Sequence, residues 1–455
     1  MPHADCRPHR LLRWPLTMLC ALLLASCGGG ESGVDEPSAS CTVAQQKTSL
    51  RGYFNDAYFW YALAPNPSPA GYASVADYFE ALLYTGTDAS FPADRWSYSE
   101  STESFNRFFG DGQTLGYGVS LAALEAAGDA TQPLYVRYVE PLSPAATAGV
   151  VRGDRVLSIN GRTAADLIAS NDFSALLAGS AGQTLAFVLR NAGGDRSVSL
   201  SSAVYALTPV SRASVTTTPL GRKLGYLVVK DMISQANAPL DAAFADFRAQ
   251  GVSDLVLDLR YNGGGLVSVA TTIAGYLAGT PVAGRPFASL LYNDKQAANN
   301  STFRFANPAP AAALGLSRVY VLMGRRTCSA SELVINGLRG VGVEVVAIGE
   351  TSCGKPVGFV PTDLGACGTT YSVVNFESVN ARNEGRYFDG FDATCAVAED
   401  WSKALGSNDE PLLATARTLA DGGACPVASA REQPMALHRG QRGREPGERQ
   451  GMIPR

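Results

Sequence analysis

The sequence predicts an α/β core, preceded by a smaller, mainly β region and by a helical region near the start of the chain. Three changes of pattern along the 455 residues support this fold class. Aromatic residues recur at helical spacing up to about Gly110, short apolar runs follow up to about Leu207, and strand-like and helix-like segments alternate after Pro209. With 46% hydrophobic residues, the chain can bury a sizeable core, and its length suggests two or three domains.

The first forty residues predict an export signal followed by a tether. Three arginines precede an apolar run from Leu16 to Leu24, which is too short to span a membrane as a mature helix. The run ends in Leu-Ala-Ser-Cys27, which resembles a bacterial lipobox, although an ordinary cleavage site that contains a cysteine is the alternative. We expect a lipoprotein signal peptide over residues 1–26, lipidation of Cys27 and a flexible tether over residues 27–40. Gly28 favours the outer membrane, on its periplasmic side, in a Gram-negative host.

Charge and hydropathy exclude two classes of partner for the rest of the chain. The net charge is -4, and the body of the sequence has no stripe of Lys and Arg that could neutralise phosphates, so nucleic acid is not an expected ligand. No later segment is long and apolar enough to cross a membrane. The expected contact with the membrane is therefore the N-terminal lipid.

Cysteine usage predicts disulfides. Of the nine cysteines, two leave with the signal and one carries lipid, which leaves Cys41, Cys328, Cys353, Cys367, Cys395 and Cys425. An even set in an exported protein favours disulfide bonds, and six cysteines allow fifteen pairings. The expected pairs are Cys41–Cys425, Cys328–Cys353 and Cys367–Cys395, with buried free thiols as the alternative. No metal site is expected, because CxxC spacing and core histidines are absent from the sequence.

Residues 41–110 predict an N-terminal helical cap. Phe54, Tyr58 and Tyr61 fall at i, i+4 and i+7, and a second helix is expected over Ser74–Tyr84 after a Pro- and Gly-rich break. We interpret the aromatic stripe as packing rather than ligand binding.

Residues 111–208 predict a small β domain. The expected strands are Tyr135–Val139, Arg155–Ile159, Thr184–Arg190 and Ser197–Leu200, with a hairpin turn over Asn191–Asp195 and a short helix around Asp172–Ala178. Gly116-Tyr117-Gly118-Val119, followed by Arg152-Gly-Asp-Arg-Val-Leu-Ser-Ile-Asn-Gly161, resembles a bacterial PDZ domain. That resemblance implies that Gly116, Tyr117, Gly118 and Val119 receive the terminal carboxylate of a peptide. A PDZ-shaped spacer without a ligand is the alternative.

Residues 209–427 predict the α/β core. The expected strands are Lys223–Val229, Leu255–Leu259, Val319–Met323 and Val343–Ile348, and the helices include Asn237–Gln250, with Asn237 as its N-cap, Val267–Leu277 and Leu333–Leu338. From residue 428 onward the composition turns polar and rich in arginine. A disordered tail is expected over residues 428–455.

Ser329 is the candidate nucleophile, and the sequence leaves few candidates for its base. The three histidines, His3, His9 and His438, lie near the termini, outside the predicted folded regions. Lys355 follows a predicted strand, 26 residues after Ser329, in a glycine-rich turn. A free lysine has a pKa of about 10.4, and burial in apolar surroundings can lower such a value by up to ~3–5 units. The alternative is structural, because Ser329 and Glu332 also fit a helix capping box.

A glycine-rich stretch offers donors for a developing oxyanion. The predicted strand before it runs into Asp258-Leu-Arg-Tyr-Asn-Gly-Gly-Gly-Leu266, where backbone N–H groups are unobstructed by side chains. The structural alternative is that the glycines only form a tight strand-to-helix turn. A phosphate-binding loop is disfavoured because no Gly-Lys-Ser/Thr follows.

Three motifs in order resemble the C-terminal processing, or tail-specific, serine proteases. They are Asp-Leu-Arg-x-Asn-x-Gly-Gly at 258–265, Ser-Ala-Ser-Glu at 329–332 and Gly-Glu-Thr-x-x-Gly-Lys at 349–355. The resemblance implies a ClpP/crotonase-like core with a PDZ domain, Ser329 as nucleophile and Lys355 as general base. It also implies an oxyanion hole made by the N–H groups of Ala330 and of Gly263 or Gly264.

The sequence departs from that family at two places. Many members carry a glutamine four residues after the lysine, where this chain has Phe359. Cys328, directly before the nucleophile, is also unusual, and a bond to Cys353 would tie the turn of Ser329 to the loop of Lys355.

The sequence therefore predicts a lipid-anchored serine endopeptidase of the cell envelope that needs no cofactor. Its expected partners are unfolded or C-terminally exposed polypeptides, docked through the PDZ-like groove. A peptide-binding protein on the same scaffold that has lost its activity is the alternative reading. An acyl-CoA enzyme of the crotonase type is disfavoured because acyl-CoA is cytosolic.

Overall fold

A computed structural model of the chain describes residues 41–126, 128–426, 449 and 451–454. The expected signal peptide, the tether, Cys27 and most of the expected tail lie outside these residues. The described residues form one compact unit, so the expected domain boundaries stay predictions. Within the described ranges no helix is both long and apolar enough to cross a membrane.

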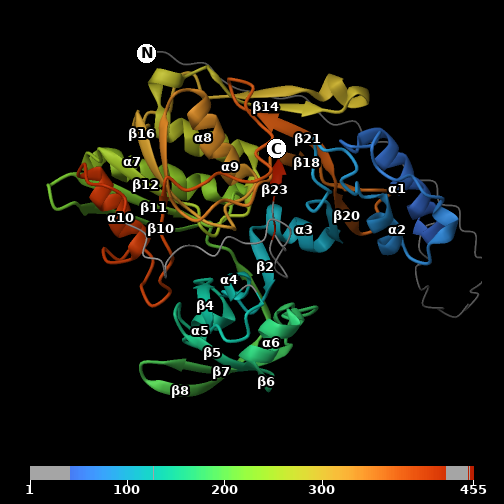
Figure 1. The fold of residues 1–455 in the computed structure, drawn as a ribbon, viewed down its shortest axis with the longest axis horizontal. Helices are drawn as coiled ribbons and strands as arrows, with labels where there is room; N and C mark the ends of the chain where they lie inside the picture. The colour runs from blue at the N-terminus through green and yellow to red at the C-terminus, as the bar shows by residue number, and fades with distance from the viewer. Residues whose placement is uncertain (1–40, 127, 427–448, 450, 455) are drawn as a thin grey trace, which may run out of the picture. The chain divides into compact units, whose positions relative to one another are not determined.

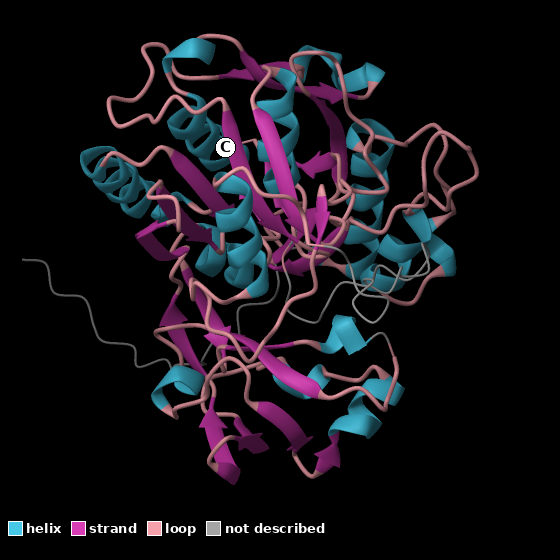
Figure 2. Cartoon of the chain, turned by 60° about the vertical axis from the view of Figure 1, so that its left-hand side comes forward, coloured by secondary structure: helices cyan, strands magenta, loops and turns pink. Residues whose placement is uncertain are grey.

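The main sheet has six strands, with helices packed on both faces (Figures 1 and 2). Its order is β10-β11-β12-β16-β17-β22, and all neighbours except the β10–β11 pair run parallel. The strands are β10 Val210–Thr217, β11 Lys223–Val229, β12 Asp254–Asp258, β16 Arg318–Met323, β17 Glu344–Gly349 and β22 Cys395–Ala396. The expected α/β core is confirmed.

The two faces of this sheet pack against different helices. Leu227 and Leu257 join a core cluster with residues of α7 (Asn237–Gln250), α8 (Val267–Ala278) and α9 (Ala330–Gly340). Tyr226 and Val256, one residue away on the same strands, pack instead with α10 (Pro411–Ala420). Burial on both sides explains the near-continuous apolar runs of these strands. The expected N-cap of α7 is wrong, because a 3₁₀ turn precedes the helix and moves the cap to Ala236.

The β domain contains a largely antiparallel sheet. Its strand order is β3-β4-β5-β7-β8, from β3 Val119–Leu121, β4 Leu134–Val139, β5 Arg155–Ile159, β7 Thr184–Asn191 and β8 Gly194–Ser201. A further pair joins β2 (Gln113–Gly116) to β9 (Ala203–Ala206). The expected helix around residues 172–178 is wrong. The structure forms α6 over Ala164–Ser170, which Thr163 caps and left-handed Asn171 ends, and then one 3₁₀ turn over Ser174–Leu176.

The N-terminal helices pack on strands that follow the candidate lysine. They are α1 (Val43–Ala57) and α2 (Val75–Leu82), and their aromatic side chains form a cluster with Val357 and Phe359 of β18 (Val357–Phe359). The first helix ends before Tyr61, because Tyr58 takes an extended conformation as its C-cap. Tyr58 and Phe54 are nevertheless buried, which supports the packing interpretation.

A second sheet, with order β15-β14-β21-β18, lies beside the main one. Its other strands are β14 Pro286–Tyr292, β15 Ser301–Arg304 and β21 Val374–Val379. The last described residues form β23 (Gly451–Ile453), which pairs in parallel with β13 (Gly264–Leu266). The expectation of disorder is therefore wrong for residues 449 and 451–454, because Met452 and Ile453 are buried.

All six expected disulfide cysteines are paired, but two of the three expected pairs are wrong. Cys328 bonds Cys353 as expected, whereas Cys41 bonds Cys367 and Cys395 bonds Cys425. Long-range packing decides these partners. Cys367 precedes β20 (Thr369–Ser372), which packs with the N-terminal helices, and Cys395 belongs to the cluster that contains α10, after which Cys425 follows.

Candidate active site

The three predicted motifs meet at one edge of the main sheet. They follow β12, β16 and β17, which are adjacent parallel strands, so their carboxyl ends lie side by side. The stretch after β12 contains Gly263 and Gly264, the stretch after β16 leads to Ser329, and the loop after β17 leads to Lys355.

Ser329 begins α9 in a backbone conformation that few residues other than glycine adopt. Its φ is 60° and its ψ is -116°, and the residue is fully buried. Ser329 and Glu332 occupy the two positions of the expected capping box. The Glu332 carboxylate accepts a hydrogen bond from the Ser329 N–H at 3.0 Å, whereas the Ser329 hydroxyl has no partner within the described part of the chain. A buried hydroxyl without a partner, on a strained turn, is available for chemistry.

Glu332 joins the serine turn to the lysine loop. One carboxylate oxygen accepts from the backbone N–H groups of Ser329 and Lys355, and the other accepts from the Gly354 N–H and the Ser352 hydroxyl, at distances of 2.6–3.0 Å. Burial raises the pKa of Glu332, and these four donors oppose that rise. The sequence indicated only a helix cap here.

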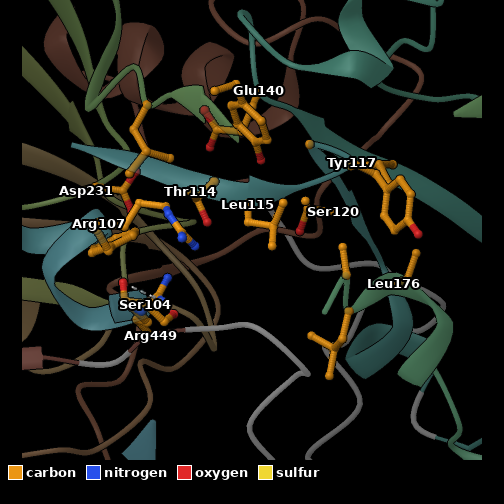
Figure 3. Close-up of a pocket in the computed structure, with 18 of the residues that line it drawn as sticks. Ser104, Arg107, Thr114, Leu115, Tyr117, Ser120, Glu140, Leu176, Asp231 and Arg449 are labelled. Atoms are coloured by element: carbon orange, nitrogen blue, oxygen red, sulfur yellow. Dashed lines mark hydrogen bonds between the residues drawn. The ribbon is translucent and has the colours of Figure 1, made fainter. Parts of the chain in front are cut away.

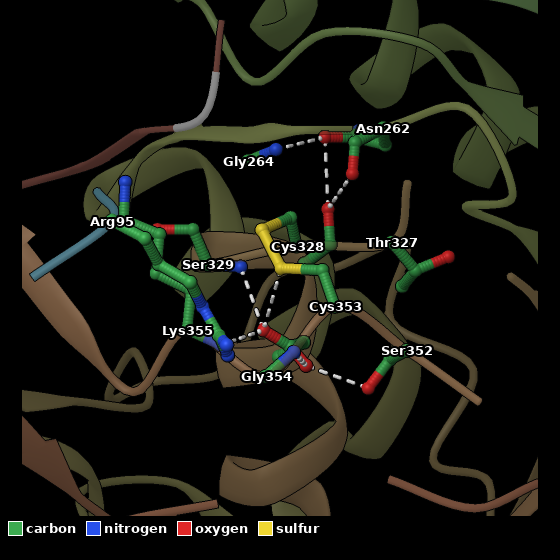
Figure 4. The surroundings of a disulfide bond; sticks show 12 residues. Arg95, Asn262, Gly264, Thr327, Cys328, Ser329, Ser352, Cys353, Gly354 and Lys355 are labelled. Carbon is green, nitrogen blue, oxygen red and sulfur yellow. Dashed lines mark hydrogen bonds between the residues drawn. A yellow bond between two sulfur atoms is a disulfide. The ribbon is translucent and has the colours of Figure 1, made fainter. Parts of the chain in front are cut away.

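The Cys328–Cys353 disulfide joins the same two segments (Figure 4). Its Cα atoms lie 5.1 Å apart, and the Cys353 N–H donates to the Thr327 carbonyl at 3.0 Å. Cys328, Cys353 and Glu332 together have the composition of a metal site, but the two sulfurs are bonded to each other. The residues next to the candidate nucleophile and base are thus linked covalently.

Lys355 is fully buried beside an aromatic ring. Its Nζ lies 3.8 Å from the centroid of the Phe359 ring. Burial disfavours the charged ammonium, while a facing ring favours it. Lys355 and Ser329 are both buried, and their backbone N–H groups donate to the same Glu332 oxygen.

The glycine-rich stretch lies against the start of α9. A Cβ atom added to Gly264 would lie 2.8 Å from the Ala330 nitrogen and 2.9 Å from the Cys328 carbonyl oxygen. The Gly264 N–H already donates to the Asn262 side chain at 2.8 Å. Ser331 donates to the same amide oxygen at 2.8 Å, so Asn262, which the sequence analysis did not single out, fixes the glycine turn to α9.

A cleft of about 1070 Å³ is lined by both the expected carboxylate loop and the edge of the glycine turn. Figure 3 shows Tyr117 of that loop in the cleft. Gly116, Tyr117, Gly118 and Val119 line it, as does Gly263. The four candidate peptide-binding residues therefore face the same space as the glycine turn.

Ion pairs connect the β domain to the loop of the candidate nucleophile. Glu125 of α4 (Ala123–Ala126) pairs with Arg326, three residues before Ser329, and with Arg137 at 3.3 Å. Arg152 of the β domain pairs with Glu399 of the core at 2.7 Å. Burial acts to raise the pKa of Glu399, but Arg260 and Arg152 outweigh it and hold that pKa below its usual value.

Glu140 titrates near neutral pH in the wall of the cleft. Burial and the Asp231 carboxylate raise its pKa to about 7, against the opposing effects of Lys230 and a backbone hydrogen bond from Thr208.

Three family models match the chain. Residues 223–387 match Peptidase family S41, residues 135–191 match a PDZ domain, and residues 45–98 match the Peptidase S41 N-terminal domain.

Relatives and a solved structure agree with these matches. A chloroplastic C-terminal processing peptidase of Tetradesmus obliquus is 27% identical over 59% of this chain and 57% of its own length. A carboxyl-terminal-processing protease of Picosynechococcus is 27% identical over 47% of this chain and 49% of its own length. The chain thus spans between about half and three-fifths of these relatives. A solved structure assigned to the S41 proteases, from Bacteroides fragilis NCTC 9343, is 25% identical with a TM-score of 0.66, over 82% of this chain and 97% of its own.

Proposed function

We propose that this chain, which belongs to peptidase family S41 and carries a PDZ domain, is a serine endopeptidase of the C-terminal processing type that uses a Ser329–Lys355 dyad. The observation that carries the proposal is the fully buried Ser329 hydroxyl, which has no hydrogen-bond partner among the described residues and lies on a strained turn that Glu332 and a disulfide join to the lysine loop. We further propose that the enzyme acts at the bacterial cell envelope, anchored through a lipid on Cys27.

In the proposed mechanism Ser329 Oγ attacks the carbonyl carbon of the scissile peptide bond. The neutral Lys355 amine accepts the hydroxyl proton and then donates it to the leaving amine. The same amine afterwards takes a proton from the water that hydrolyses the acyl-enzyme. Burial of Lys355 supports this role because it disfavours the ammonium before the reaction.

The oxyanion would be held by the N–H groups of Ala330 and Gly263. Ala330 follows the nucleophile at the start of α9, where backbone N–H groups have no partner in the helix. Gly263 is preferred over Gly264, because the Gly264 N–H is engaged by Asn262. The two donors would approach the carbonyl oxygen from different elements, α9 and the glycine turn.

The PDZ domain would hold the C-terminus of an unfolded substrate in the shared cleft. Backbone N–H groups of Gly116–Val119 would bind the terminal carboxylate, and the preceding chain would lead toward Gly263. The pair of Glu125 with Arg326 offers a route by which an occupied PDZ domain could affect the loop of Ser329.

The test compares the wild type with Ser329→Ala and Lys355→Ala in cleavage of an unfolded protein that has an apolar C-terminus. Circular dichroism checks that the three proteins fold equally. We expect the wild type to cleave and both variants to lose activity by at least roughly 10³-fold. A wild type that does not cleave, with and without PDZ-binding peptides, would instead favour the alternative of a peptide-binding protein without activity. Phe359, at the position where the family resemblance implies glutamine, supports that alternative. Cleavage by Ser329→Ala would point to another nucleophile.

A further inference from the structure

The C-terminal segment of the chain lies in the catalytic region as an added strand. Gly264, Gly265 and Leu266 of β13 pair in parallel with Gly451, Met452 and Ile453. The Gly451 N–H donates to the Gly263 carbonyl at 3.0 Å. The pairing edge thus belongs to the glycine turn that also supplies the proposed oxyanion donor.

The added strand lies between β13 of the glycine turn and β18, the strand that follows Lys355. A Cβ on Gly264 would clash with the Gly451 carbonyl oxygen while also touching the Ala330 nitrogen. A Cβ on Gly358, three residues after Lys355, would lie 2.5 Å from the Met452 carbonyl oxygen. Glycine on both walls therefore lets a peptide backbone approach closely.

The apolar side chains of this segment are as deeply buried as those of the core. Met452 is fully buried and belongs to the main core cluster, and Ile453 is 2% exposed. A Cβ on Gly451 would lie 3.2 Å from the Gly265 Cα, so only a small residue fits at that position without displacement. The bound pattern is a small residue followed by two large apolar ones.

Arg449 anchors the start of the segment outside this groove. Its guanidinium pairs with Glu100 at 2.8 Å, donates to the Ser104 hydroxyl at 2.6 Å and lies 4.5 Å from the Phe108 ring centroid. Arg449 also lines the cleft that contains the PDZ carboxylate loop, as Figure 3 shows.

We propose that β13 and the pocket of Met452 form a binding subsite for an extended peptide, and that the chain's own residues 451–454 occupy it until a substrate displaces them. The inference rests on the proposed peptidase function, because it gives the class of sequence that the same site takes. A substrate would add its backbone to β13, with a small residue opposite Gly264 and a large apolar side chain in the pocket of Met452. The C-terminal segment competes with every such substrate.

The test uses full-length protein with the substitution Met452→Asp or Arg449→Glu. An aspartate cannot fill an apolar pocket, so cleavage of an unfolded protein should rise roughly tenfold or more relative to wild type. Arg449→Glu removes the partly exposed anchor and should raise the rate of cleavage about threefold. Because this variant keeps Met452 in the core, it serves as the test if Met452→Asp folds poorly. Arg304→Glu, at an exposed arginine on β15, is the matched control for charge reversal and should leave the rate unchanged.

A second readout does not depend on catalysis. A fluorescent peptide of sequence RQGMIPR is titrated against the full-length Ser329→Ala protein, with and without Met452→Asp. Binding should be at least roughly tenfold tighter when Met452→Asp has freed the subsite. The peptide RQGDIPR should bind at least roughly tenfold more weakly than RQGMIPR.

The outcomes separate this inference from the proposed function. Tight, sequence-dependent peptide binding in a protein that never cleaves would support the subsite and refute the peptidase. Cleavage at the wild-type rate by both tail variants, with no difference between the two peptides, would refute the subsite and leave the peptidase intact.

Discussion

Removal of the Cys328–Cys353 disulfide tests whether that bond positions the dyad or only stabilises the fold. The perturbation is the double variant Cys328→Ala/Cys353→Ala. The structure offers a matched control, Cys395→Ala/Cys425→Ala, because the two bonds close loops of similar length but only one joins the proposed nucleophile and base.

The expected loss of stability is nearly the same for both variants. The bonded cysteines are 25 and 30 positions apart, so the loss of loop-closure entropy lowers the free energy of unfolding by about 3.5 kcal/mol in each case. A domain with a stability of about 5–15 kcal/mol remains mostly folded after such a loss. Activities can therefore be compared at 25 °C without denaturant.

The expected activities differ. Without the bond at the site, the serine turn and the lysine loop are still joined by the Glu332 hydrogen bonds, by the backbone hydrogen bond from Cys353 to Thr327 and by packing. Small displacements of catalytic groups lower the rate strongly. We expect kcat to fall by roughly tenfold or more in the Cys328/Cys353 variant and by less than about twofold in the Cys395/Cys425 variant.

The assay combines urea unfolding, followed by circular dichroism, with steady-state cleavage of an unfolded protein. Full activity of the Cys328/Cys353 variant, or of the wild type in strong reductant, would refute the positioning role. Equal losses of kcat in both variants would assign the effect to stability alone.

Three further predictions address single side chains. Glu332→Gln replaces one accepting oxygen by an amide group that cannot accept a hydrogen bond, so urea titration should show a free energy of unfolding lower by at least about 2 kcal/mol. An unchanged midpoint would contradict the role of Glu332 in joining the serine turn to the lysine loop. Because the pKa of Glu140 is about 7 when folded and 4.5 ordinarily, its contribution to stability is full below about pH 4.5 and is lost as the pH rises to about 7. The free energy of unfolding of the wild type should therefore fall over that range by up to about 3 kcal/mol relative to Glu140→Gln, and parallel pH curves would exclude this titration. Phe359→Leu removes the ring that faces the Lys355 amine and favours the ammonium formed when that amine accepts the serine proton. We therefore expect kcat to fall about three- to tenfold with little change in KM. A change confined to KM would show that the ring serves substrate binding instead.

Local patterns predicted the architecture because they report on burial. The alternation after Pro209 marked β11, β12, β16 and β17 within a residue or so of their observed bounds, since each strand is buried on both faces. Once those strands are parallel neighbours, the three motifs that follow them must meet at one edge, and Ser329 and Lys355 do so. Their catalytic roles stay predictions.

What the sequence could not predict depends on contacts between distant segments. The partners of Cys41 and Cys395 follow from which helix packs on which strand, and the local pattern does not contain that information. The acceptor role of Glu332 toward the loop at 352–355 depends on the same packing. Polar composition predicted a disordered end, but Gly451–Ile453 carry a short apolar pattern that a pairing edge far back in the sequence can bind.

The Cys41–Cys367 bond governs how the protein responds to being pulled from its ends. The two cysteines are 326 positions apart, so most of the chain, including the whole PDZ domain, lies inside one covalent loop. Tension applied at both termini passes from one sulfur to the other and cannot extend what lies between them, even if it unfolds. Reduction of this one bond, with the enclosed Cys328–Cys353 bond intact, would release an additional contour length on the order of 1,000 Å. An unfolding machine that translocates a single strand would therefore stall at this pair of residues under oxidising conditions.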